Sequence, residues 1–344
     1  MTTLFLVFII LSAVAVLLFM VLKLKISAFI SLLITAIYVG IVAGMPLQDI
    51  TKSIQDGMAG TLGFVATVVG LGAIFGQMLE SSGGAESLAH SLIKKFGTDK
   101  ASWAMVITGF IVAIPVFFDV GFIILVPIIY ALSRDSKRSL LYYGIPLLAG
   151  LAVTHSFIPP TPGPVAVADI INAQLGWVIL LGAIIGFPTA IIAGPIFGKY
   201  IAKKIYILPP KEFENSSEKK YDENNLPSFL LIAVIIAVPL FLILINTFTG
   251  LAIDKQIISQ SGITDILEFL GHPFSALIIA TLLATYFLCF KRGMSKQKIL
   301  DLSTKALGPA GIIILITGAG GVLKQVLVDS GIGTIMAESM ANSA

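Results

Sequence analysis

Charged residues are scarce in this chain, and their scarcity decides its class. Only 12% of the 344 residues are Asp, Glu, Lys or Arg, whereas 57% are hydrophobic. A soluble globular domain carries about 25% charged residues. The composition therefore excludes a soluble domain and predicts a polytopic membrane protein in contact with a lipid bilayer.

Cysteine is almost absent, and excess charge is small. The single cysteine, Cys289, excludes an intramolecular disulfide and a cysteine-based metal cluster. No metal site and no cofactor are expected. The net charge is only +3. The basic residues therefore indicate membrane topology, and no nucleic-acid partner is expected.

Long apolar stretches predict membrane-spanning helices. A helix crosses a hydrocarbon core with about 17 to 25 residues at 1.5 Å per residue. Five stretches have this character, and they predict an all-α polytopic membrane protein: residues 2–22, 26–44, 176–198, 228–248 and 273–290.

Lysine and arginine cluster in five short connections, which the positive-inside rule places in the cytoplasm. The connections 45–57 and 251–272 hold one Lys each and are predicted to be external, as is the N-terminus. The basic clusters are Lys23/Lys25, Lys94 to Lys100, Arg134 to Arg138, Lys199 to Lys220, and Lys291 to Lys305.

One apolar segment does not alternate between the two sides. Residues 102–132 have a basic, cytoplasmic connection at both ends, so they are predicted to form a re-entrant hairpin. The turn is expected near Ile114 to Gly121 and contains a single carboxylate, Asp119. Such a turn must be buried in protein or line a cavity, because lipid offers no hydrogen bonds.

A proline-rich segment, THSFIPPTPGP at residues 154–164, interrupts the next apolar stretch. Its four prolines lack N–H groups and push their predecessors out of the helical region, so no helix continues through them. The prediction is a broken helix over 140–173, which unwinds at Pro159 to Pro164 and resumes over 165–173. The two broken elements are expected to meet near the membrane midplane.

Residues 60–91 and 308–339 form an internal repeat with a shift of 248 and no gaps. With the predicted loops, the two copies cross the membrane in opposite directions, which is typical of secondary transporters with a site at the repeat interface. Ten of 32 positions are identical: Gly60/Gly308, Gly63/Gly311, Gly70/Gly318, Gly72/Gly320, Gln77/Gln325, Leu79/Leu327, Ser82/Ser330, Gly83/Gly331, Ala89/Ala337 and Ser91/Ser339.

These features predict a modular organisation along the chain. The parts are N-terminal scaffold helices (1–57), a first inverted repeat with the hairpin and broken helix (58–205), a cytoplasmic linker (206–227), connecting transmembrane helices (228–305), and the start of a second repeat (306–344).

Four stretches resemble the gluconate permease family of proton symporters, within the ion transporter superfamily. They are VGLGAIFGQMLESSGGAESLA, IPVFFDVGFIILVPI, LAVTHSFIPPTPGPVAVA and LGPAGIIILITGAGGVLKQVLVDSG. The resemblance covers essentially the whole chain, and FFDVGF and THSFIPPTPGP are specific to it.

The resemblance implies a transporter, not an enzyme, in the cytoplasmic (inner) membrane of a bacterium. Its substrate would be gluconate, a related sugar acid or a small hydroxylated carboxylate imported with protons; D-serine is an alternative substrate and Na⁺ an alternative coupling ion. The implied fold has a scaffold, a mobile transport domain, re-entrant hairpins and a homodimeric assembly.

The end of the sequence carries a further expectation. The first hairpin and broken helix, 101–174, would recur at 349–422 after the same shift, whereas the sequence ends at Ala344. The second repeat is therefore expected to be incomplete and the chain to be C-terminally truncated.

Candidate site residues lie in the two broken elements. Asp119 is predicted to exchange the coupled proton, because a carboxylate at membrane depth is costly unless compensated; the alternative is a static hydrogen bond that closes the turn. Pro115, Phe118 and Gly121 are predicted to shape that turn. His155 either pairs with the substrate carboxylate or packs uncharged in a polar pocket.

Hydroxyl and backbone groups at the break suit a polyol acid. Thr154, Ser156 and Thr161 carry hydroxyls, which in membrane helices also bond back to helix carbonyls. The N–H groups and positive helix terminus near Pro162 and Gly163 would bind a carboxylate. The repeat glycines are expected to permit close helix packing: Gly70, Gly72, Gly318 and Gly320.

Two other classes of function fit less well. An intramembrane hydrolase using Ser156 or His155 would need a nucleophile, a base and an orienting group. Adjacent residues on one helix point about 100° apart, and the remaining histidines border loops. A channel is the third class, which the inverted repeat and the acidic hairpin disfavour.

Overall fold

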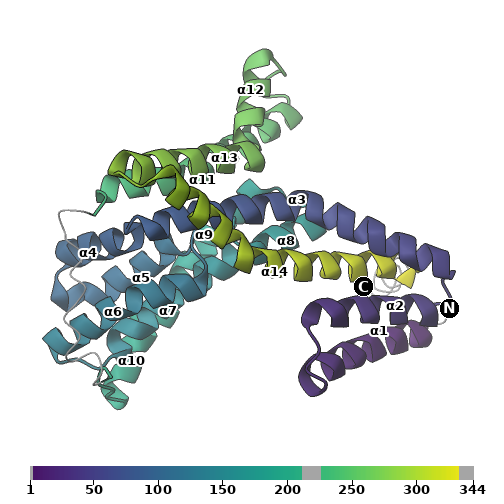
Figure 1. Cartoon of the computed structure of the whole chain (residues 1–344), viewed down its shortest axis with the longest axis horizontal. Helices are drawn as coiled ribbons and strands as arrows, with labels where there is room; N and C mark the ends of the chain where they lie inside the picture. The colour runs from purple at the N-terminus through teal and green to yellow at the C-terminus, as the bar shows by residue number, and fades with distance from the viewer. Residues whose placement is uncertain (1–2, 211–225, 333–344) are drawn as a thin grey trace. The chain divides into compact units, whose positions relative to one another are not determined.

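The computed structural model describes residues 3–210 and 226–332. The described residues form helices joined by short connections and contain no β-strand (Figure 1). Within the described residues, seven helical segments are long and apolar enough to cross a membrane, which confirms the all-α polytopic class. The predicted span 26–44 is a shorter apolar helix of 15 residues, Ala28–Val42.

The α-helices follow the order of the sequence. They are α1 (Thr3–Leu18), α2 (Ala28–Val42), α3 (Leu47–Ser81), α4 (Gly84–Phe96), α5 (Ala101–Val112), α6 (Phe118–Ser136), α7 (Leu141–Phe157), α8 (Pro162–Ile170), α9 (Leu175–Ile191), α10 (Phe197–Lys204), α11 (Phe229–Asp254), α12 (Gly262–Gly271), α13 (Pro273–Ala284) and α14 (Lys296–Asp329).

The helices divide into two compact units by packing. The first unit comprises Met1–Thr67 and Pro309–Ala344, and the second comprises Val68–Gly308. Helices α3 and α14 contribute to both units. The division follows packing and not sequence similarity, so the predicted repeat boundaries stay predictions. Most of the predicted linker 206–227 and the last residues of the second repeat lie outside the described residues.

The first unit buries apolar side chains of α1, α2 and α14, including Leu6, Val39 and Val326. Its α3 and α14 approach closely at glycines: a Cβ at Gly57 would lie 2.8 Å from Val322 Cα, and one at Gly321 would collide with Thr61. Close backbone approach at small residues is a common way for helices to associate in a membrane.

The second unit contains the two broken elements. Helices α4, α5, α6, α7 and α10 lie side by side in it (Figure 1). Glycine allows α5 and α7 to touch backbone to backbone. A Cβ at Gly109 would lie 2.6 Å from the Leu147 carbonyl oxygen, and a Cβ at Gly150 would collide with the Val106 carbonyl oxygen.

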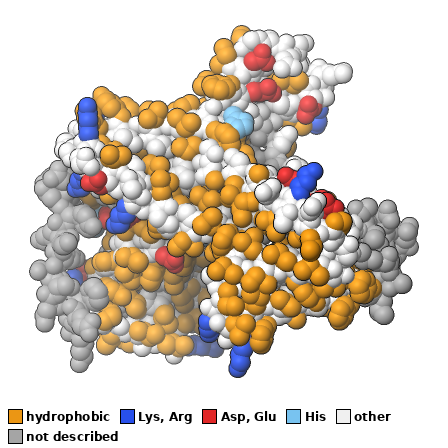
Figure 2. Space-filling model, turned by 45° about the vertical axis from the view of Figure 1, so that its right-hand side comes forward, with side chains coloured by type: hydrophobic (Ala, Val, Ile, Leu, Met, Phe, Trp, Pro, Cys, Tyr) orange, Lys and Arg blue, Asp and Glu red, His pale blue; other side chains and the backbone are white. Residues whose placement is uncertain are grey.

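Hydrophobic side chains cover much of the surface seen in Figure 2. Large apolar residues stay exposed along several predicted spans, among them Phe8, Leu181, Leu230 and Leu282. Exposed apolar surface of this extent is the expected lipid-facing surface of a membrane protein.

The two copies of the sequence repeat end in the same local structure. Helix α3 ends at Ser81 and α14 at Asp329, positions that a shift of 248 superimposes. Gly83 and Gly331 follow with left-handed φ angles of 76° and 75°. The preceding serines each donate back to a helix carbonyl, Ser82 to Leu79 at 2.8 Å and Ser330 to Leu327 at 3.0 Å. The repeat therefore encodes where each helix ends and its C-terminal cap.

The α5–α7 contact predicts which glycine in α7 is essential. Gly150→Ala should lower the free energy of unfolding by about 1–3 kcal/mol, because the added methyl group collides with the α5 backbone. Gly144→Ala is the matched control on the same helix, where a Cβ meets nothing within 4 Å. Unfolding of the detergent-purified protein gives the comparison, and equal or greater stability of Gly150→Ala would contradict the packing argument.

Candidate functional site

The first broken element is the connection between α5 and α6. Non-helical backbone runs from 113 to 117, and α6 begins at Phe118 after Phe117 takes an extended conformation (φ −59°, ψ 145°). The turn predicted near Ile114 to Gly121 is thus shorter, and Phe118 and Gly121 lie in the first turn of α6. An acidic residue in that turn, Asp119, complements the positive helix terminus, which favours helix from Phe118 onward.

The hairpin arms do not qualify as separate spans. Helix α5 has 12 residues, and neither α5 nor α6 belongs to the seven candidate membrane spans. The re-entrant hairpin over 102–132 stays a prediction. Gly121 faces inward, where a Cβ would lie 2.9 Å from Leu151 of α7.

The second broken element joins α7 and α8. Helix α7 ends at Phe157, and α8 begins at Pro162, so the unwound backbone covers 158–161 and the predicted restart at 165 is wrong. The physical reason is that proline is well tolerated in a first helical turn, because an N–H at that position would have no intrahelical acceptor. Thr161 Oγ1 donates to the Ile158 carbonyl oxygen at 2.7 Å and so closes the break.

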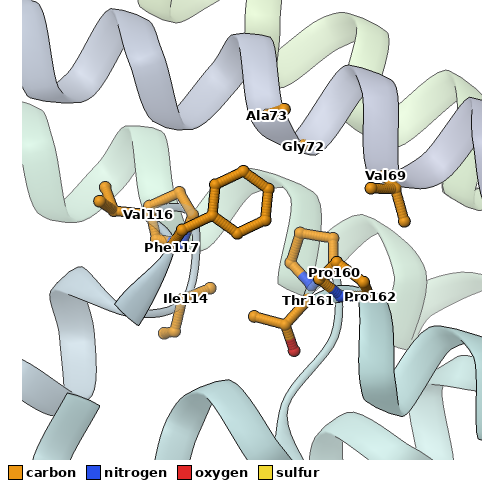
Figure 3. Close-up of a pocket in the computed structure, with 10 residues that line it drawn as sticks. Val69, Gly72, Ala73, Ile114, Val116, Phe117, Pro160, Thr161 and Pro162 are labelled. Carbon is orange, nitrogen blue, oxygen red and sulfur yellow. The ribbon is translucent and has the colours of Figure 1, made fainter. Parts of the chain in front are cut away.

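Helix α3 covers both breaks with one face. A Cβ at Gly76 would collide with the Pro115 carbonyl oxygen, and a Cβ at Gly72 would lie 3.5 Å from the Pro160 ring. Figure 3 shows α3 passing over the hairpin turn and the proline break, with the Phe117 ring and Pro160 below it. The hairpin and the broken helix therefore do meet, and α3 brings them together.

A small pocket lies where these three elements meet. Its walls come from α3, from the hairpin turn and from the proline break, and they are Val69, Gly72, Ala73, Ile114, Pro115, Val116, Phe117, Pro160, Thr161 and Pro162. The cavity is only about 10 Å³. This is room for about one water molecule, so any larger ligand enters only if the elements separate.

Two helix N-termini border the pocket. Helix α6 begins directly after the hairpin turn and α8 directly after the break, and neither has a side-chain cap at its N-cap residue, Phe117 or Thr161. First-turn N–H groups have no intrahelical acceptor and carry the positive end of the helix dipole. In α8, Pro162 and Pro164 have no N–H, so Gly163 supplies the N–H between them.

His155 links the two broken elements. The centroid of its ring lies 6.2 Å from that of the Phe117 ring, in an edge-to-face arrangement. Asp119 is near enough to interact with His155 electrostatically. His155 Nδ1 is buried and has no hydrogen-bond partner among the described residues. Thr154 is fully buried, and its Oγ1 likewise has no partner in that part of the chain.

The other predicted residues are placed less centrally. Ser156 and Gly163 are exposed, and Gly163 has open space where a Cβ would be. Thr161 is buried, and its hydroxyl oxygen points away from α3 in Figure 3, toward the carbonyl it bonds. The Thr161 hydroxyl therefore bonds back within the break, as the alternative interpretation allowed, and its contact with a polyol hydroxyl stays a prediction.

The repeat glycines differ from one another. Gly72 packs on the break, and Gly318 packs on Met58 and Leu62. A Cβ at Gly70 would be in ordinary contact, 3.8 Å from Leu307, and one at Gly320 would meet nothing within 4 Å. Close packing thus requires glycine only at Gly318, where a Cβ would lie 2.5 Å from Met58 Sδ, whereas a Cβ at Gly72 would be in ordinary contact, 3.5 Å from Pro160.

Sequence reasoning missed the α3 wall and Phe117. Val69, Gly72, Ala73 and Gly76 follow the spacing i, i+3, i+4, i+7, which marks one helix face. That spacing was the available signal. The sequence signal for Phe117 was weaker: it is the last residue before a first helical turn that contains an acidic residue.

The fold and the site define a multi-pass membrane protein with a pocket between discontinuous helices, the architecture of secondary transporters. The model of the GntP family permeases matches residues 4–344. A gluconate permease of Pseudomonas aeruginosa is 39% identical over 93% of this chain and 70% of its own length. This chain belongs to the GntP permease family, whose members are transporters and not enzymes.

Two Escherichia coli K12 proteins are similar over nearly the whole chain. A low-affinity gluconate transporter is 38% identical over 99% of this chain and 75% of its own length. A Gnt-II system L-idonate transporter is 37% identical over 97% of this chain and 75% of its own length.

The exposure pattern at the break predicts a difference in cysteine reactivity. With Cys289 replaced by Ala, Gly163→Cys should react with a membrane-impermeant maleimide faster than Thr161→Cys, because Gly163 is exposed and Thr161 is buried. Labelling of inverted and right-side-out vesicles, with and without gluconate, measures both rates. If Gly163→Cys reacts only with lipid-soluble reagents, it faces lipid and the break is not an aqueous site.

Proposed function

We propose that this protein transports gluconate or a closely related sugar acid across the bacterial inner membrane, coupled to protons. One observation carries the proposal: two uncapped helix N-termini, those of α6 and α8, border a single pocket. The relatives named above, gluconate transporters and an L-idonate transporter, give the substrate class.

Helix termini suit an anion that must bind and leave. A carboxylate at the α6 and α8 N-termini receives N–H donors and two positive dipole ends without a permanent cationic partner. Dipoles bind an anion more weakly than a desolvated arginine would, which lets the substrate dissociate on the other side. Discontinuous helices serve this purpose in transporters of several folds.

Hydroxyl recognition falls to the buried end of α7. Thr154 Oγ1 and His155 Nδ1 are polar atoms that are shielded from solvent and have no partner within the described residues. A buried polar atom without a hydrogen bond is costly, and a polyol chain would supply the missing partners. These two side chains are the proposed contacts to the substrate hydroxyls.

Asp119 and His155 form the proposed proton pathway. The Asp119 carboxylate lies in the first turn of α6, beside the proposed site for the substrate carboxylate. It is also close enough to the His155 imidazole to interact with it electrostatically. Two anions at one pair of helix termini repel each other, so substrate binding favours protonation of Asp119. This coupling would make each gluconate carry a proton with it.

Orientation and assembly follow the basic connections and the family resemblance. The connections around Lys94 to Lys100, Arg134 to Arg138 and Lys199 are proposed to face the cytoplasm, with the N-terminus outside. A homodimer is proposed from the resemblance, with substrate carried by one protomer independently of the other.

The test is uptake by purified protein in liposomes. Radiolabelled gluconate should accumulate under an inwardly directed proton gradient, and unlabelled L-idonate should compete. Gluconate equilibrating without accumulation would indicate a channel, and uptake driven only by a sodium gradient would replace the proton as coupling ion. Failure of both acids to bind or move would reject the substrate class.

Asp119→Asn should uncouple transport from protons. One pH unit sustains about tenfold accumulation in a one-proton symporter, since about 1.4 kcal/mol corresponds to a factor of ten. The variant should reach an inside-to-outside ratio of about one while still exchanging internal for external gluconate. The amide fills the same space but carries no exchangeable carboxyl proton.

Asp135→Asn is the matched control, because Asp135 lies in the last turn of the same helix and pairs with Arg134 in solvent. It should accumulate gluconate as the unmodified protein does. Normal accumulation by Asp119→Asn would remove Asp119 from the proton pathway.

A further inference from the structure

A second, larger cavity opens at the other end of α7, away from the proline break. It has a volume of about 450 Å³ and lies where three predicted cytoplasmic connections come together. Its charged lining consists of Arg138, Lys199 and Lys203 against a single carboxylate, Asp99. Three cationic side chains around one hollow make a site for an anion.

Backbone and side-chain hydrogen bonds build the wall of this cavity. The segment after α10 returns along the start of α7, where Leu140 N–H donates to the Ile207 carbonyl oxygen at 2.9 Å. Ser139 Oγ donates to the Ile205 carbonyl oxygen at 3.0 Å and accepts from Ile207 N–H at 3.2 Å. The α10 end is thereby tied to α7, which fixes Lys199 and Lys203 relative to Arg138.

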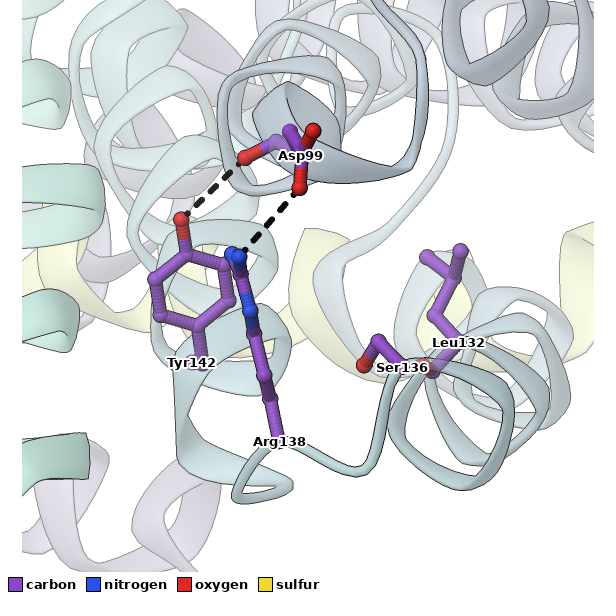
Figure 4. A network of polar contacts seen from close by, with 5 residues as sticks. All are labelled: Asp99, Leu132, Ser136, Arg138 and Tyr142. Atoms are coloured by element: carbon purple, nitrogen blue, oxygen red, sulfur yellow. Dashed lines mark hydrogen bonds and ion pairs between the residues drawn. The ribbon is translucent and has the colours of Figure 1, made fainter.

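Arg138 is held in place within the lining (Figure 4). Its guanidinium donates to Asp99 at 3.3 Å and lies 4.9 Å from the centre of the Tyr142 ring. Tyr142 in turn donates to the Asp99 backbone oxygen at 3.4 Å. A guanidinium group held between a carboxylate and an aromatic face keeps N–H donors that can bond phosphate oxygens.

The surroundings of the cavity select among anions. Large apolar and aromatic side chains are exposed on α10 and the segment after it: Phe197, Tyr200, Ile205, Tyr206 and Leu208. Tyrosine beside basic residues is characteristic of the membrane interface, where acyl chains lie next to headgroups. A free phosphate would leave these apolar side chains exposed, whereas the acyl chains of a phospholipid would cover them.

We infer that this cavity binds the phosphate headgroup of an anionic phospholipid of the cytoplasmic leaflet, with the acyl chains lying along α10. Basic pockets between transmembrane helices on the cytoplasmic side commonly take such headgroups. The bound lipid would fasten the α10 end to α7, at a distance along α7 from the proposed substrate pocket. The inference rests on no step of the proposed transport.

The test titrates phosphatidylglycerol into the full-length protein in a neutral detergent, at fixed ionic strength. Native mass spectrometry counts the lipid retained, and the midpoint of thermal unfolding follows its effect. Lys203→Gln should weaken phosphatidylglycerol binding about fivefold, and Lys199→Gln with Lys203→Gln about 25-fold, since each interfacial lysine contributes a comparable factor. Zwitterionic phosphatidylcholine should bind weakly and show no dependence on these lysines.

Lys204→Gln is the matched control. It removes the same charge from the neighbouring residue of α10, but Lys204 contacts Tyr200 and does not line the cavity. Its affinity for phosphatidylglycerol should stay within about twofold of the unmodified protein.

Three results would overturn the inference. Equal losses in Lys203→Gln and Lys204→Gln would mean general surface attraction. Inorganic phosphate binding as tightly as the lipid would make this a free-anion site, and gluconate displacing the lipid would assign the cavity to the substrate. Should the double variant fail to fold, Lys203→Gln and 0.5 M salt on the unmodified protein decide the question, because lost lysine contacts and screening must both release the lipid.

Discussion

Backbone polar groups cannot be left bare in a lipid bilayer, and this constraint governs the second unit of the molecule. Both breaks, 113–117 and 158–161, expose backbone that a continuous helix would have satisfied. The chain covers them from one side with the glycine face of α3, where Gly76 meets the Pro115 carbonyl and Gly72 the Pro160 ring. Any larger residue at Gly76 would lift α3 off the hairpin turn and expose that carbonyl.

Small residues also determine the packing between α5 and α7. Their glycines allow backbone contact in a medium where apolar burial gives no advantage over lipid, so van der Waals fit supplies the association. Tight contact fixes where α7 can end relative to the hairpin. His155 therefore lies beside Phe117 because α5 and α7 are fixed against each other 5 to 11 residues before these two side chains.

Hydropathy and charge predicted the membrane class, because they set the free energy of transferring a segment from water to lipid. The prolines predicted the break, because their effect on the backbone is local. The shared end of α3 and α14, with a left-handed glycine two residues after each helix, is a structural finding that the sequence repeat explains afterwards. The restart of α8 was placed three residues late, because Pro162 and Pro164 were treated only as helix breakers. The sequence left two roles open for the Thr161 hydroxyl, a bond back to its own turn and a ligand contact, because the choice depends on rotamer and local space.

The pocket between the two helix N-termini has room for about one water molecule, so a larger anion fits only where the walls move apart. Its walls are a hairpin turn, a proline break and a helix face, and only the last is continuous helix. The Thr161 to Ile158 hydrogen bond is internal to the proline break. Movement of the break away from α3 would leave this bond intact. An anion that entered between them would meet first-turn N–H groups already oriented by α6 and α8, so binding would need displacement of helices and no new folding.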